Sequence, residues 1–126
     1  MKTYETSYAP SYVTRTRVEV YIPKRFTPEY RVSLAWLIGE LTKTYGGCTV
    51  HENAFGYYRS SSKAIIDEPM SVVYSDFNMD WDLPLERAAV LDYCNRLKRL
   101  LLDNLSEEEV LVSAFPVSHI TPSASI

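Results

Sequence analysis

The residues best suited to acid–base catalysis or ligand binding lie close together in the chain. They are His51, Tyr57, Tyr58, Arg59 and Glu68. A histidine titrates near neutral pH, and an arginine and a glutamate beside it can hold or polarise a substrate. If the segments that carry them pair as strands, His51 could meet Tyr57, Arg59 or Glu68 across the sheet. These five residues are our candidate ligand-binding set. The simpler interpretation, which we favour, is a surface histidine with an Arg–Glu ion pair.

Other patterns that could bind a metal are weak in this sequence. His51 and His119, even with a carboxylate such as Asp67, lack the ligand spacing of a zinc site. Three aspartates, Asp76, Asp80 and Asp82, lie in or just before an acidic loop at 78–84, but this segment lacks the glycine and the final glutamate of a calcium-binding EF-hand loop. We therefore predict no metal site.

The glycine-rich segment YGGC does not have the layout of a phosphate-binding loop. Such a loop follows a strand and opens a helix, whereas Gly46 and Gly47 are expected to close a helix and lead into a strand. Cys48 then lies beside the negative end of that helix, which disfavours a thiolate, and Cys94 lies in an apolar helical stripe. We interpret both as free core thiols, and we predict no cofactor and no catalytic residue.

Length and charge narrow the functional class further. The chain has 126 residues, 46% hydrophobic and 23% charged, which is typical of one soluble globular domain. A net charge of −3 argues against general nucleic-acid binding. No apolar run approaches the roughly 18 residues of a membrane helix, and MKTYETSYAPSYV resembles no signal peptide, so we expect a cytosolic protein.

The hydrophobic periodicity predicts six elements that must position these residues. They are a strand at 14–23, a helix from Pro28 to Tyr45, extended segments at 48–59 and 64–77, a helix at about 85–104 and a strand at 110–115. The order βαββαβ is typical of ferredoxin-like domains. We therefore predict an α+β sandwich, a four-stranded antiparallel sheet with two helices on one face.

The predicted domain covers residues 14–118, between a tyrosine-rich N-terminal arm at 1–13 and a flexible tail at 119–126. Tyr4, Tyr8 and Tyr12 recur at helical spacing in the arm, although Pro10 interrupts a helix there. Disordered tails are poor in aromatic residues, so we expect this arm to pack on its own domain or on a neighbouring subunit.

The sheet face that the helices leave open should carry Tyr21 and Phe115. Such a partly aromatic face commonly docks on another surface. We therefore favour a non-enzymatic module that self-associates, most simply as a twofold dimer, through Tyr21, Phe115 and the tyrosines of the arm. The alternative is a small dimeric enzyme or ligand binder that uses the candidate set. A weaker alternative is single-stranded RNA binding by stacking on Tyr21, Tyr57 and Phe115.

Several segments spread over residues 16–118 resemble a family of small uncharacterised bacterial proteins with a ferredoxin-like fold. A first strand like Arg17–Tyr21 is followed by a helix that ends in glycine, a Thr-Val strand, a Gly-x-aromatic-Arg segment and an Ile-x-x-Glu-Pro strand. The matching residues are Gly47, Thr49, Val50, Gly56, Tyr58, Arg59, Ile65, Glu68 and Pro69. The family often has tryptophan at the place of Tyr58. The resemblance implies the fold and brings no activity with it.

Overall fold

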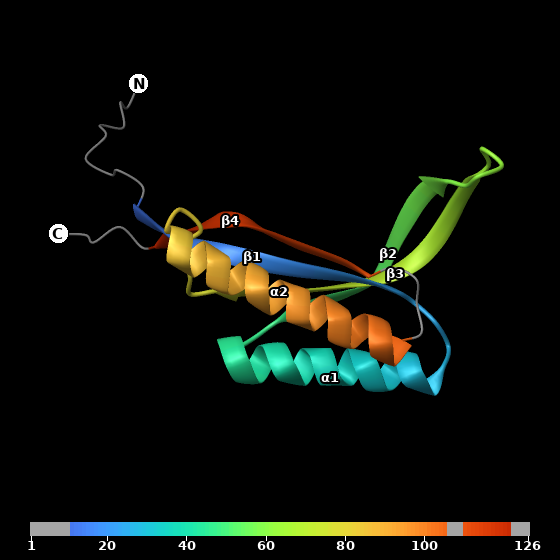
Figure 1. The fold of residues 1–126 in the computed structure, drawn as a ribbon, viewed down its shortest axis with the longest axis horizontal. Helices are drawn as coiled ribbons and strands as arrows, with labels where there is room; N and C mark the ends of the chain where they lie inside the picture. The colour runs from blue at the N-terminus through green and yellow to red at the C-terminus, as the bar shows by residue number, and fades with distance from the viewer. Residues whose placement is uncertain (1–10, 106–109, 122–126) are drawn as a thin grey trace, which may run out of the picture.

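The computed structural model describes residues 11–105 and 110–121, and its elements follow the predicted order. Four antiparallel strands form one sheet in the order β2-β3-β1-β4, and two helices cover one of its faces (Figure 1). The elements are β1 (Ser11–Pro23), α1 (Pro28–Tyr45), β2 (Thr49–Arg59), β3 (Ile65–Phe77), α2 (Pro84–Leu105) and β4 (Leu111–Thr121). The predicted ferredoxin-like α+β sandwich is confirmed.

The start of β1 and the end of β4 differ from the sequence prediction. β1 begins at Ser11, inside the predicted N-terminal arm, and β4 runs to Thr121, inside the predicted tail. These extensions pair with each other, with Ser11 opposite Thr121. The sequence prediction ended the last strand at residue 115, just before Pro116, a residue without a backbone donor. A proline is tolerated here because β4 lies at the edge of the sheet.

The core lies between the sheet and the two helices. Alternate residues of β1 face the helices and are fully buried, while their neighbours face the open side, which confirms the predicted alternation. The helices contribute the stripes expected from a period of 3.6 residues. The residues that are at most 2% exposed include Val18, Val20, Ile22, Leu37, Leu41, Val73, Phe77, Val90, Leu97 and Leu101.

The ends of α1 follow the predicted capping signals. The Thr27 hydroxyl accepts a hydrogen bond from the Tyr30 amide, and Pro28 occupies the first turn. At the other end, Gly46 has a φ of 89°, and its amide donates to the Thr42 carbonyl at 2.9 Å. A left-handed conformation of this kind favours glycine, so the YGG segment is a helix terminator that leads into β2.

A buried hydrogen bond ties α1 to the sheet and provides a test of the packing. The hydroxyls of Tyr30 and Ser71, both in residues at most 5% exposed, bond to each other. Tyr30→Phe removes one partner and leaves the Ser71 hydroxyl buried, so we expect the free energy of unfolding to fall by about 1–3 kcal/mol in urea denaturation. Tyr57→Phe, at a site 68% exposed, should be neutral. Equal stability of both variants would contradict this packing.

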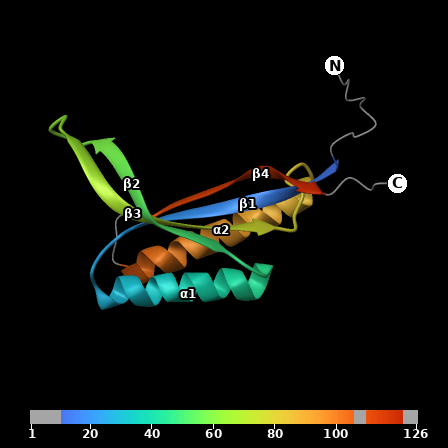
Figure 2. The same cartoon turned by 180° about the vertical axis from the view of Figure 1, so that it is seen from behind.

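The β2–β3 hairpin extends beyond the rest of the sheet. We call its distal part, residues 54–70, the hairpin arm. The pairing of β3 with β1 ends where Met70 lies opposite Pro23, and a β-bulge interrupts β2 between His51 and Ala54. Figures 1 and 2 show that the arm bends away from the helices, at the end of the sheet opposite the start of β1 and the end of β4. Beyond Met70, the arm therefore has no neighbouring strand on either side among the described residues.

Candidate functional site

The hairpin arm exposes a concentration of large apolar side chains. Five of them are 43–78% exposed, namely Phe55, Tyr57, Tyr58, Ile65 and Ile66. Exposed apolar residues scattered singly are ordinary, whereas a group of them on one projecting element marks an interaction surface. A two-stranded hairpin is also marginally stable by itself in water. The arm is therefore the part of the described surface best suited to contact another molecule.

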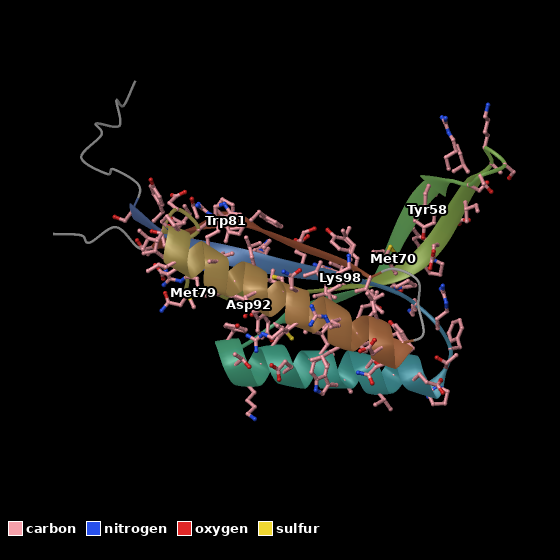
Figure 3. The ribbon with its side chains drawn as sticks, viewed as in Figure 1. Tyr58, Met70, Met79, Trp81, Asp92 and Lys98 are labelled. Carbon is pink, nitrogen blue, oxygen red and sulfur yellow. The ribbon has the colours of Figure 1, made fainter. Side chains whose placement is uncertain are left out.

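Strand register assigns these side chains to two faces of the arm. Tyr58 and Ile66 lie opposite each other on one face, and Tyr57 and Phe55 lie on the other, because successive residues of a strand alternate. On the first face the Tyr58 hydroxyl donates a hydrogen bond to Glu68. Figure 3 places Tyr58 on the arm and Met70 where the arm joins the sheet. Apolar surface is thus exposed on both faces.

Glu68, an acidic residue of the arm, accepts two side-chain hydrogen bonds. Besides the Tyr58 hydroxyl, it accepts a hydrogen bond from the Arg25 guanidinium at 2.8 Å. The hydrogen bond from Tyr58, followed by that from Arg25, lowers the pKa of the Glu68 carboxyl. Sequence reasoning expected an Arg–Glu pair here with Arg59 as the nearest arginine. The ion pair is instead formed with Arg25, which reaches the base of the arm from the end of β1.

The structure does not gather the candidate ligand-binding set into one site. His51 lies before the bulge, opposite Val72, and its ring stacks on Tyr74 with centroids 5.9 Å apart. Tyr57 and Arg59 lie on the face of the arm opposite to Tyr58. All of these side chains are exposed except that of Glu68, which is partly buried. None of the five lines either of the two clefts described below.

The open sheet face carries a polar cluster that the sequence analysis did not find. Arg17 donates two hydrogen bonds to Asp76, from Nε at 2.7 Å and Nη2 at 3.0 Å. His119 Nε2 lies 2.6 Å from Asp76 Oδ2, and the Arg17 guanidinium lies over the Tyr74 ring at 4.3 Å. The hydrogen bonds from Arg17 and then from His119 lower the pKa of the Asp76 carboxyl. This cluster holds three strands together at one end of the sheet.

The predicted interface residues have different surroundings. Tyr21 is partly buried on the open face and donates its hydroxyl to Glu19 at 2.6 Å, a bond that raises the pKa of Tyr21. Phe115 is partly buried opposite Arg17. Tyr12 is 60% exposed at the start of β1. Tyr4 and Tyr8 lie outside the described residues. The open face is therefore more polar than predicted, and five of the exposed large apolar side chains lie on the hairpin arm.

Two clefts indent the described surface. One, of about 530 Å³, lies between the helices and is lined by Pro28, Glu29, Val32, Ser33, Trp36, Leu100 and Asn104. The other, of about 380 Å³, lies where α1 leads into β2 and is lined by Tyr45, Gly47, Cys48, Thr49, Tyr74, Ser75 and Asp76. Neither combines a nucleophile with a base in hydrogen-bond contact, which is the arrangement used for nucleophilic catalysis.

The cysteines do not form a reactive or metal-binding site. Cys94 is buried, and burial raises the pKa of its thiol to about 11, so it stays protonated at neutral pH. Cys48 is partly buried against the core. Within residues 11–105 and 110–121, no group of three or more histidine, cysteine, aspartate or glutamate side chains could hold a metal ion.

Comparison with known proteins assigns no relative to this chain: no family model and no curated protein matches it. The resemblance to the uncharacterised bacterial family therefore stays a prediction. In the described part of the chain, neither helix combines the length and the apolar character needed to span a membrane.

Proposed function

We propose that this protein is a non-enzymatic assembly module that self-associates through the hairpin arm. The observation that carries the proposal is the exposure of five large apolar side chains on an arm that projects beyond the core. Interfaces are enriched in aromatic residues of this kind, and association would remove them from water. This proposal keeps the predicted dimer and moves its contact surface from the open sheet face to the arm.

Several features support this proposal over the alternatives. The candidate residues for an enzyme lie on different faces of the hairpin, and His51 stacks on Tyr74 rather than on another member of the set. The net charge of −3 disfavours binding to nucleic-acid phosphates. The two free thiols are in keeping with a cytosolic location for the module.

The test is the oligomeric state of the untagged protein by native mass spectrometry and light scattering over a concentration series. We expect a dimer with no added mass. The dissociation constant of the dimer should be at least about tenfold higher in the double variant Tyr57→Ser/Ile65→Ser, because truncating an interface anchor typically costs about 2 kcal/mol of binding free energy. Both sites are more than two-thirds exposed, so the fold should survive, as a circular dichroism spectrum would verify.

The matched control is Leu85→Ser, which removes another highly exposed apolar side chain, at the start of α2 and outside the arm. It should dimerise like the wild type. A wild-type protein that is monomeric at every concentration would overturn the proposal, as would an arm variant that dimerises as tightly as Leu85→Ser. A discrete added ligand mass on a monomer would instead favour the small-molecule binder.

A further inference from the structure

The distal part of β2, residues 54–59, offers an exposed backbone edge, whereas nearer the core the Glu52 carbonyl accepts a hydrogen bond from Lys24 Nζ at 3.3 Å. In the sheet order, β2 is an outer strand, and β3 is its one partner among the described residues. Unpaired N–H and C=O groups on such an edge can pair with another strand unless the edge is protected by proline, lysine, a bulge or a cover. β2 has its bulge before Ala54, and the segment 54–59 that follows carries neither proline nor lysine.

The other edges of the sheet are less available. β4, the opposite outer strand, contains Pro116 near its middle, which removes a donor. On the β3 side of the hairpin arm, Arg25 reaches across to Glu68, and the Lys24 amide donates to the Pro69 carbonyl at 2.8 Å. Segment 54–59 of β2 is therefore the part of the sheet edge that is most available to pair with another strand.

The side chains of this segment complement a second copy of themselves. In a twofold antiparallel pair, each residue lies beside one from the same face of the other copy. With the axis at Gly56, Phe55 of each copy lies beside Tyr57 of the second copy. Cross-strand aromatic pairs of this kind stabilise a sheet. Gly56 suits the position on the twofold axis. A Cβ at this residue would lie 2.9 Å from Met70 Sδ, so the Met70 side chain already fills the space beside Gly56 on that face of the arm.

We infer that the protein dimerises by antiparallel pairing of β2 with β2 of a second copy, about an axis near Gly56, so that the two four-stranded sheets become one. The inference rests on the proposed function and names its contact surface. Such a dimer is isologous and closed, which is the commonest symmetry of soluble oligomers. The pairing satisfies the free backbone edge and buries apolar surface of the arm in one step.

Area and charge are consistent with a second copy as the occupant. At 150–250 Å² for a full aromatic side chain, the exposed fractions of Phe55, Tyr57 and Tyr58 amount to roughly 350 Å² per copy. A standard interface buries about 800 Å² per partner, so these three residues could supply at most nearly half of it before the backbone edge is counted. The arm carries two cations, Arg59 and Lys63, and two anions, Asp67 and Glu68, so two arms do not repel each other.

Hydrogen exchange tests the edge pairing separately from the dimer itself. The full-length wild type is compared with Tyr57→Ser/Ile65→Ser at one concentration at which native mass spectrometry finds the wild type dimeric. We expect lower deuterium uptake by the wild type in the peptide that covers 54–59, and equal uptake in β4. A dimer with equal uptake at 54–59 would overturn the inference and leave the proposed function standing. A monomer would overturn both.

Disulfide trapping tests the position of the axis. Phe55→Cys and Tyr57→Cys chains are mixed and oxidised under mild conditions, with Leu85→Cys as the control for random collision. We expect the mixed disulfide to exceed both like-with-like disulfides, because residues directly opposite each other have Cα atoms about 4.5–5.5 Å apart, within reach of a disulfide. Like-with-like disulfides in excess, or a yield no greater than that of Leu85→Cys, would overturn the Gly56-centred pairing.

Discussion

Replacing Phe77 with alanine should lower the free energy of unfolding by about 3–5 kcal/mol, the range of Phe→Ala substitutions in a protein core. Phe77 is 1% exposed at the end of β3. Its ring stacks on Tyr45 with centroids 3.5 Å apart and meets Tyr93 edge-on at 5.7 Å. Truncation would therefore open a cavity between sheet and helices and remove two aromatic contacts. Urea denaturation followed by circular dichroism measures the loss.

The same substitution on the hairpin arm is the matched control. Phe55 is 57% exposed, so Phe55→Ala removes an equal volume of side chain without opening a cavity. Its free energy of unfolding, measured below the concentration of dimerisation, should change by no more than about 0.5 kcal/mol. If the two variants lost equal stability, the aromatic cluster around Phe77 would not be the anchor of this core.

The fold was predictable because its signals are local. The alternation of Val18, Val20 and Ile22 requires only neighbouring residues, as does the helical stripe of Leu34, Leu37 and Leu41. Thr27 and Gly46 mark the ends of α1 by capping chemistry that acts within one turn. Two helices and four strands identified in this way admit few arrangements, and the βαββαβ order selects one of them.

The hairpin arm was not predictable because it depends on where one strand stops relative to another. The sequence predicted extended segments at 48–59 and 64–77. It did not reveal that β1 ends at Pro23 while β2 and β3 continue without it. That mismatch exposes the five apolar side chains. Exposure of this kind is a property of the assembled sheet and has no local signature in the strands themselves.

The open-face cluster was missed for a related reason. Asp76 was placed near the end of the extended segment 64–77 and His119 in the tail, since neither position carries a motif. They meet because β1 pairs with β3 on one side and with β4 on the other, which brings residues 43 positions apart into hydrogen-bond contact. A continued alternation through Val117 and His119 was the one available signal, and Pro116 concealed it.

The variant Asp76→Asn should lower the free energy of unfolding by about 1.5–3 kcal/mol at pH 7, the range for hydrogen bonds to a charged group. Asp76 is 16% exposed and accepts two hydrogen bonds from Arg17 and one from His119. An asparagine has no charge, and its amide nitrogen would face one of these donors. The loss is expected mainly because Arg17 and His119 would then lack their common carboxylate.

The pH dependence of this loss identifies the carboxylate as its source. The folded protein lowers the pKa of Asp76 below its ordinary value of 3.8, chiefly through the hydrogen bonds from Arg17. The contribution of Asp76 is therefore complete above about pH 5 and disappears as the pH falls through the folded-state value. The stability difference between wild type and Asp76→Asn should accordingly be present at pH 5 and shrink as the pH falls further.

Two further variants separate this charge pair from general effects. Asp67→Asn removes an exposed carboxylate from the hairpin arm and should leave the stability nearly unchanged. In a double-mutant cycle, Arg17→Met and Asp76→Asn should cost less together than the sum of their separate losses, because both remove the same contact. Additive losses, or a difference that persists unchanged below pH 3, would show that the Arg17–Asp76 pair does not stabilise the sheet in this way.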